Sequence, residues 1–324
     1  MASVDTIWNL IKKHKLSFPD ISKKSDVRSK FHISSLEEFI DLFINVIQNC
    51  FKTIADLEML LDDARDYLLR NNIVYSEIFF APTKFIFNGF DFKEMIAVLD
   101  QASVSFKKKN NILVRFLIDV SRTNGSENAM NNLNLTLKYK TDSIIGIGLG
   151  GSEEKGPAKD YAKVFQKAKK SGLLVVAHAG EVIGPESVWD AIKLLKAQRI
   201  GHGISSMFDE SLMDYLRDQR IPLEICPTSN IFTRKYVTRI EQHPIRLFFD
   251  RGILVTVNTD DPTIFGVDLV DEYYTLYKNN IFTFDEILQL LKNNIDATFL
   301  PDNEKKKLMT RVEKVLQAAP VSAT

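Results

Sequence analysis

The chain has 324 residues, of which 45% are hydrophobic, and its 42 Lys and Arg residues balance 42 Asp and Glu residues. This length and apolar content can form one large α/β domain, and the zero formal net charge gives no overall field that points to nucleic acid or an anionic membrane. The two cysteines are too few for a disulfide framework, and no signal peptide or membrane-spanning run is visible. We therefore expect a cytoplasmic protein without nucleic-acid or membrane partners.

The first part of the chain is predicted to be helical. Apolar residues recur at helical spacing from Val4 to Ile11, and Ser35-Leu36-Glu37-Glu38 has the spacing of a capping box at the start of a second helix. A third helix is expected over about 53–70. Phe39 and Phe43 in this region are predicted either to cover a pocket or to belong to the core.

After residue 70 the pattern changes to short apolar strands that alternate with helices. Seven strands are predicted near residues 74, 113, 144, 174, 199, 222 and 253. The intervening sequence has helical periodicity over 92–109, 127–138, after Pro157, and over 186–196, 209–219 and 244–250; a further capping box begins a helix at Thr283.

Regular β/α alternation over this length favours a TIM (β/α)₈ barrel with extra helices over an open doubly wound sheet. Such a barrel needs eight strands, so we expect the first strand to lie before Met1, through truncation or genuine loss. An open edge between the strands near 74 and 253 is then expected to carry unpaired backbone groups and to reduce stability. No low-complexity linker interrupts residues 1–324, which we predict to be a single domain.

Polar motifs stand at the carboxyl ends of four predicted strands, where barrel enzymes place their active sites. They are Gly151, His178 with Glu181, His202, and Asp260-Asp261. An imidazole and a carboxylate, His178 and Asp260, are suitable ligands for a divalent metal. Glu181, partly desolvated, would have a raised pKa and could move protons. Adjacent aspartates point to different sides, so Asp261 is free to orient a substrate.

Each motif also has an ordinary structural explanation. The glycines over 146–151 lack the dinucleotide-binding spacing, and Asp260-Asp261-Pro262 alone could be a turn. His202 could be a core histidine, His243 is expected at the start of a helix, and Cys226 is expected to be a buried structural thiol rather than a nucleophile. The common position of four motifs at four strand ends favours a functional site over these separate explanations.

The motifs resemble those of the adenosine deaminase family of metal-dependent barrel hydrolases. The resemblance is carried by His178-Ala179-Gly180-Glu181, Gly201-His202-Gly203, Cys226-Pro227-Thr228-Ser229-Asn230 and Thr259-Asp260-Asp261-Pro262, and more loosely by Gly150-Gly151-Ser152-Glu153. It implies hydrolytic deamination of adenosine or deoxyadenosine to inosine or deoxyinosine plus ammonia, with a small-molecule purine nucleoside as the partner. The resemblance also implies one Zn²⁺ that activates the attacking water.

The resemblance gives each matching residue a role. His178 and Asp260 would ligate zinc. Glu181 would protonate the purine nitrogen N1 and His202 would assist the attacking hydroxide. Asp261 would orient water and accept a hydrogen bond at N7, and the backbone N–H of Gly151 would contact N3.

One feature of the family pattern is missing. The family's first strand carries a His-x-His pair that supplies two further metal ligands, and none of the five histidines forms such a pair. We therefore predict weak or no zinc binding by this chain, which would leave it inactive. The alternatives are a deaminase of another 6-aminopurine compound, such as adenine or aminodeoxyfutalosine, and a non-catalytic purine-binding barrel.

Overall fold

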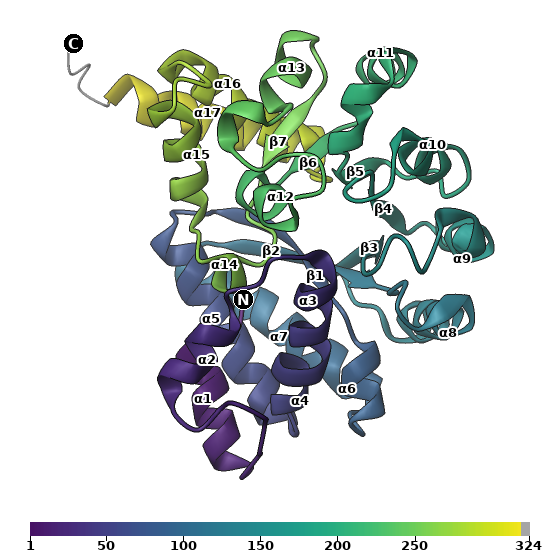
Figure 1. The fold of residues 1–324 in the computed structure, drawn as a ribbon, viewed down its shortest axis with the longest axis vertical. Helices are drawn as coiled ribbons and strands as arrows, with labels where there is room; N and C mark the ends of the chain where they lie inside the picture. The colour runs from purple at the N-terminus through teal and green to yellow at the C-terminus, as the bar shows by residue number, and fades with distance from the viewer. Residues whose placement is uncertain (319–324) are drawn as a thin grey trace.

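Seven parallel strands form one sheet in which each strand lies beside the next in sequence (Figure 1). The computed structural model describes the backbone of residues 1–318 and the side chains up to residue 314. The strands are β1 (Tyr75–Phe80), β2 (Leu113–Asp119), β3 (Ile144–Leu149), β4 (Leu174–Ala179), β5 (Arg199–His202), β6 (Leu223–Ile225) and β7 (Val255–Val257). All seven predicted strands are present, and the curled sheet confirms a TIM-like barrel that lacks one strand.

Helices follow the strands and cover the outer face of the sheet, as Figure 1 shows for α8 to α11 beside β3 to β5. Their apolar faces meet the apolar strands, so the core lies between the two layers. Thr283 caps its helix with the predicted capping box. The main covering helices are α7 (Phe92–Asn110), α8 (Gly125–Tyr139), α9 (Ala162–Lys170), α10 (Pro185–Lys193), α11 (Glu210–Asp218), α13 (Ile245–Asp250) and α16 (Phe284–Ala297).

The amino-terminal part is helical, as predicted, but it is more divided than the sequence indicates. Ser35 caps α3, which passes into a π-helical segment, a conformation that often marks a functional site. The segments are α1 (Val4–Lys13), α2 (Lys24–Lys30), α3 (Leu36–Asp41), η1 (Leu42–Ile47), α4 (Gln48–Cys50) and α5 (Ile54–Arg70).

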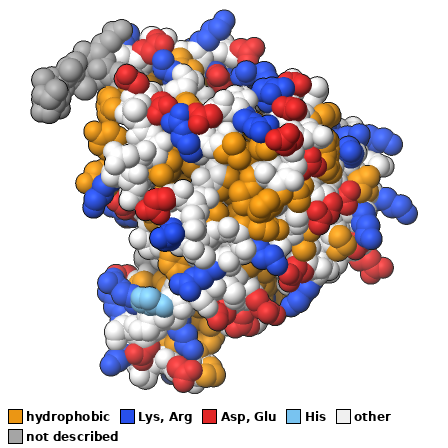
Figure 2. All heavy atoms as spheres, turned by 45° about the horizontal axis from the view of Figure 1, so that its top comes forward, with side chains coloured by type: hydrophobic (Ala, Val, Ile, Leu, Met, Phe, Trp, Pro, Cys, Tyr) orange, Lys and Arg blue, Asp and Glu red, His pale blue; other side chains and the backbone are white. Residues whose placement is uncertain are grey.

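Short helical segments complete the connections between strands and the carboxyl-terminal region. These are α6 (Thr83–Phe87), η2 (Ala158–Tyr161), η3 (Ile204–Phe208), α12 (Pro227–Thr233), η4 (Ile240–Gln242), α14 (Pro262–Phe265), α15 (Leu269–Lys278) and α17 (Asp302–Ala318). The described helices all fall short of the length and apolar character that crossing a bilayer demands. On the face shown in Figure 2, basic and acidic side chains are interspersed, in keeping with the balanced charge of the sequence.

A buried ion-pair cluster lies inside the curl of the sheet. Arg199 of β5 contacts Glu77 of β1 at 2.5 Å and Glu224 of β6 at 2.8 Å. Its guanidinium also donates to the carbonyl oxygen of Ala297, at the end of α16, at 2.9 Å. One side chain therefore connects three strands and the last covering helix.

Within the described residues no strand joins β1 to β7, so the expected open edge is present. The expectation of unpaired backbone groups is nevertheless wrong for Val257 and for the carbonyl group of Val255 on β7. The side chain of Asn294 accepts from the Val257 N–H at 3.1 Å and donates to the Val257 carbonyl oxygen at 3.0 Å. Asn293 donates to the carbonyl oxygen of Val255 at 3.2 Å. Two side-chain amides of α16 thus take the place of a neighbouring strand.

Replacing Asn294 with alanine is expected to lower the free energy of unfolding by about 1–3 kcal/mol, because both backbone groups of Val257 lose their partner. Denaturant unfolding measures this change. Asn279→Ala is the matched control, since the exposed Asn279 amide bonds only within its own helix. Equal effects of the two substitutions would contradict a special role for Asn294.

Candidate functional site

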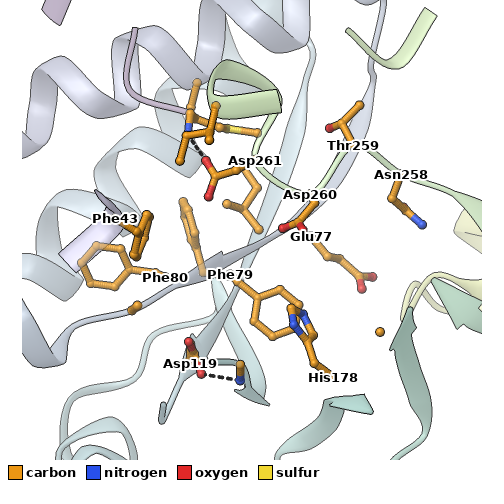
Figure 3. Close-up of a pocket in the computed structure, with 18 of the residues that line it drawn as sticks. Phe43, Glu77, Phe79, Phe80, Asp119, His178, Asn258, Thr259, Asp260 and Asp261 are labelled. Carbon is orange, nitrogen blue, oxygen red and sulfur yellow. Dashed lines mark hydrogen bonds and ion pairs between the residues drawn. The ribbon is translucent and has the colours of Figure 1, made fainter. Parts of the chain in front are cut away.

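A cavity of about 610 Å³ lies within the curl of the sheet and opens between the strand ends and the amino-terminal helices. Phe39 supplies part of its apolar wall, as do Phe43 and Phe79 (Figure 3). This favours the prediction that Phe39 and Phe43 cover a pocket. Every site residue predicted from the sequence lines this one cavity: Gly151, His178, Glu181, His202, Asp260 and Asp261.

The polar residues reach the cavity from the carboxyl ends of β4, β5 and β7. His178 belongs to β4, Glu181 follows that strand, and His202 ends β5. His202 and Asp260 both adopt a positive φ, of 62° and 56°, which is uncommon for residues other than glycine. Such backbone strain often accompanies functional sites, because the fold must hold side chains in directions that relaxed strands do not offer.

His178 and Asp260 are the two candidate metal ligands. The ring of His178 packs edge-on against His202, with centroids 4.8 Å apart, and a Cβ atom at Gly201 would collide with it. Burial lowers the pKa of His178 well below its usual range, which keeps the imidazole neutral as ligation requires. Asp260 accepts a hydrogen bond from Ser229 Oγ at 2.8 Å.

The donor set does not complete a metal centre. Among the described residues, no three His, Cys, Asp or Glu side chains gather to hold an ion. Catalytic zinc normally has three protein ligands and an open position, and only His178 and Asp260 are in place here. The residues present therefore do not fit a catalytic zinc ion.

Glu181 and His202 form a buried acid–imidazole pair. His202 Nε2 lies 3.5 Å from Glu181 Oε2, and both side chains are almost inaccessible to solvent. Burial raises the pKa of Glu181 to about 7. Its other carboxylate oxygen has no hydrogen-bond partner within the described residues. Glu181 can therefore gain or lose a proton near neutral pH.

A second buried carboxylate, Glu153, holds the turn that carries Glu181. Its two oxygens accept hydrogen bonds from the four backbone N–H groups of residues 180–183 and from the hydroxyl of Ser187. In the sequence, Glu153 is recognised only as the last residue of the loosely matching Gly150-Gly151-Ser152-Glu153 motif. Five donors on one carboxylate fix the backbone direction from which Glu181 enters the cavity.

Gly151 and Asp261 face the remaining parts of the cavity. Gly151 has a φ of 96°, and its N–H makes no hydrogen bond within the described residues. Asp261 Oδ1 accepts from the amino group of Met1 at 2.9 Å (Figure 3). A free amide and a partly buried carboxylate are groups that a polar ligand can engage.

Asp119, at the carboxyl end of β2, is a site residue that the sequence motifs do not indicate. Its Oδ1 accepts from the backbone N–H groups of Gly150 and Ser121, both at 2.9 Å, and burial raises its pKa. The available signal was its position, since Asp119 ends a strand as the other site residues do (Figure 3). Asp119 thus holds the glycine loop at Gly150 in position through the backbone.

Two other sequence predictions have different outcomes. Cys226 is buried, as expected, and burial raises the pKa of its thiol, which makes it a poor nucleophile. His243 does precede α13, but it is fully enclosed and bonds to Asn230 and to the Ile245 N–H. It is thus part of the network behind His202.

A curled parallel sheet with acids and imidazoles at its carboxyl ends is the architecture of the amidohydrolase barrels. The chain belongs to the adenosine deaminase family, whose sequence model matches residues 2–315. The recognition made from the sequence motifs is confirmed.

Similar proteins include deaminases with several named substrates. The chain is 33% identical to an aminodeoxyfutalosine deaminase of Streptomyces avermitilis, over 91% of this chain and 83% of that one. It is 31% identical to an adenine deaminase of Vibrio parahaemolyticus, over 96% of this chain and 91% of the other. The crystal structure of an adenine deaminase from Arthrobacter aurescens superposes with a TM-score of 0.93 at 25% identity, covering 98% of this chain and 96% of that one.

The raised pKa of Glu181 gives stability a definite pH dependence. A carboxyl with a pKa of about 7 in the folded protein, above its ordinary value of 4.5, favours folding below pH 4.5, and this contribution is lost as the pH rises through 7. The Glu181→Gln variant should not show this pH-dependent loss of stability, because glutamine does not ionise. In chelator-treated protein, the variant should gain on the order of 3 kcal/mol relative to wild type between pH 5 and pH 8. If the free energies of unfolding of the two proteins changed with pH in the same way, the raised pKa of Glu181 would be contradicted.

Purified chain is expected to bind well below one zinc ion per molecule after dialysis, because two protein donors hold the ion weakly. Metal analysis after incubation with zinc measures this. His178→Ala should abolish the remaining binding, whereas His32→Ala, at an exposed histidine, should not. Tight binding of one zinc ion per molecule would contradict this prediction, because it would require ligands besides His178 and Asp260.

Proposed function

We propose that this site serves the hydrolytic deamination of a 6-aminopurine, in which water replaces the exocyclic amine and ammonia leaves. The observation that carries the proposal is the buried Glu181 carboxyl, with a pKa of about 7, in the same cavity as His202 and Asp261. An acid that titrates near neutral pH suits a reaction that must first donate a proton and later recover it.

Glu181 would give its proton to the ring nitrogen N1, which makes C6 electrophilic. Water then adds its oxygen to C6, and the Glu181 carboxylate takes up the proton that this water releases. Glu181 passes that proton to the amine, which leaves as ammonia, and recovers the proton of the new C6 hydroxyl as the C6 carbonyl forms. His202, at 3.5 Å from Glu181, would hold the attacking oxygen on the face of the ring beside C6. Burial of this pair keeps bulk water from competing for the proton.

Recognition of the base would fall to groups on two other strand ends. The free N–H of Gly151 would contact N3, and Asp261 would contact the N7 edge and orient water. Phe43 and Phe79 would enclose the planar ring, as aromatic walls do in purine sites (Figure 3). These contacts read the purine ring itself and leave room for a sugar within about 610 Å³.

The relatives leave the substrate open among adenosine, adenine and aminodeoxyfutalosine, since proteins named for each are similar over most of this chain. Adenosine and deoxyadenosine remain our first candidates, and a nucleoside is compatible with the cavity. His178 and Asp260 are two of the groups that could hold a zinc ion. We assign no step to a metal, because these two donors are too few.

The second candidate function is purine binding without catalysis. It is favoured by one observation, the presence of only two metal donors among the described residues. Such a protein would use the same Gly151 and Asp261 contacts but would not exchange the amine.

Ultraviolet assays with adenosine, deoxyadenosine, adenine and aminodeoxyfutalosine, with and without added zinc, test the proposal. We expect conversion of at least one compound to its 6-oxo product, and Glu181→Gln should lower kcat by about 100-fold or more. Glu58→Gln, at an exposed glutamate, is the control and should retain activity.

Calorimetry with the same compounds separates the two candidate functions. Purine binding without any product would favour the non-catalytic barrel. Absence of both binding and turnover would exclude both candidates.

A further inference from the structure

A chain of hydrogen bonds leads from His202 away from the cavity. His202 Nδ1 lies 3.0 Å from Asn230 Nδ2, and Asn230 Oδ1 lies 3.2 Å from His243 Nε2. The chain ends where the backbone N–H of Ile245 meets His243 Nδ1 at 3.1 Å. The side chains are at least 96% buried, so water does not provide alternative partners.

The hydrogen bond between Ile245 and His243 sets the direction of the other hydrogen bonds in this series. The backbone N–H of Ile245 can only donate, so His243 Nδ1 must accept. Burial lowers the pKa of His243 to about 3, and the ring is therefore neutral. Its single proton stands on Nε2 and is donated to Asn230 Oδ1.

The same reasoning continues through Asn230 to His202. With its oxygen engaged by His243, Asn230 presents its NH₂ group to His202 Nδ1, which must accept. The proton of the His202 ring is then on Nε2. This nitrogen is the one that lies 3.5 Å from Glu181 Oε2.

We propose that Asn230 and His243 are positioning residues that fix the tautomer of His202, so that its Nε2–H points to Glu181 and the cavity. The inference rests on the proposed function in treating His202 as part of the reacting site. It deepens that function because it leaves Glu181 as the proton donor and gives His202 the fixed role of a hydrogen-bond donor.

The nearby carboxylates favour a second proton on the His202 ring, which the hydrogen-bond chain opposes. Burial disfavours the charged imidazolium, but Glu181 and Asp260 outweigh it and raise the pKa of His202. A second proton on Nδ1 would, however, face the N–H of Asn230, which cannot turn without losing its bond to His243. Two opposed buried donors would each lack an acceptor, which disfavours this arrangement. The geometry of the hydrogen-bond chain therefore opposes a second proton on Nδ1 and leaves Nε2 as the protonated nitrogen.

Nitrogen NMR of ¹⁵N-histidine-labelled protein reports the tautomer directly and requires no turnover. With five histidines in the chain, the His202 signals can be assigned by single substitutions. At neutral pH we expect a protonated Nε2 and an unprotonated Nδ1. Asn230→Asp replaces the NH₂ donor by an acceptor and should move a proton onto Nδ1.

Two further variants complete the test. His243→Phe removes the anchor, so Asn230 can turn and His202 should show both tautomers. Asn132→Asp is the matched control, because Asn132 is equally buried but bonds to Thr83, and it should preserve the wild-type pattern.

A protonated Nδ1 in the wild-type protein would overturn the inference, as would an unchanged pattern in a folded Asn230→Asp variant. If that variant does not fold, the wild-type spectrum and His243→Phe still decide. Failure of the proposed function is separate, since it would appear as absent turnover with the Nε2–H tautomer intact.

Discussion

A buried guanidinium connects parts of the sheet that no backbone hydrogen bond joins. Arg199 bridges Glu77 on β1 and Glu224 on β6 across the interior of the curl. In a closed barrel a complete ring of strand pairs would hold the curvature, but here β1 and β7 are not neighbours in the described sheet. Removing one partner of a buried ion pair typically costs about 3–5 kcal/mol, which shows how strongly such a contact can fix geometry. The strand ends that form the site depend on this curvature.

Two neighbouring glutamates show how surroundings give one residue type two roles. Glu153 accepts five hydrogen bonds, and these hold the turn at residues 180–183 in place. Glu181 lies in the turn that Glu153 holds. One of its carboxylate oxygens has no hydrogen-bond partner in the described structure, and burial raises its pKa. The first carboxylate is structural support, and the second is available to exchange a proton.

The sequence predicted the strands and the lining of the cavity because both follow from local patterns. Strands buried on both faces appear as short apolar runs, and parallel strands bring the residues at their ends to one place. The roles of Glu153 and Asn230 escaped prediction because they depend on partners far along the chain, and the role of His243 depends on that of Asn230. Glu153 lies 27–34 residues from its donors, and Asn230 lies 28 residues from His202. The pairing of Asn294 with β7 likewise depends on how α16 packs, which no short motif records.

The two edges of the sheet are therefore not equivalent. Assembly by sheet extension, in which molecules join edge to edge, needs two receptive edges on each molecule in order to continue. Asn293 and Asn294 bond to the N–H and carbonyl groups of Val257 and to the carbonyl group of Val255. A strand from another molecule could pair along β7 only by displacing these amides. Two asparagines on one helix thus oppose continuous sheet extension through this edge.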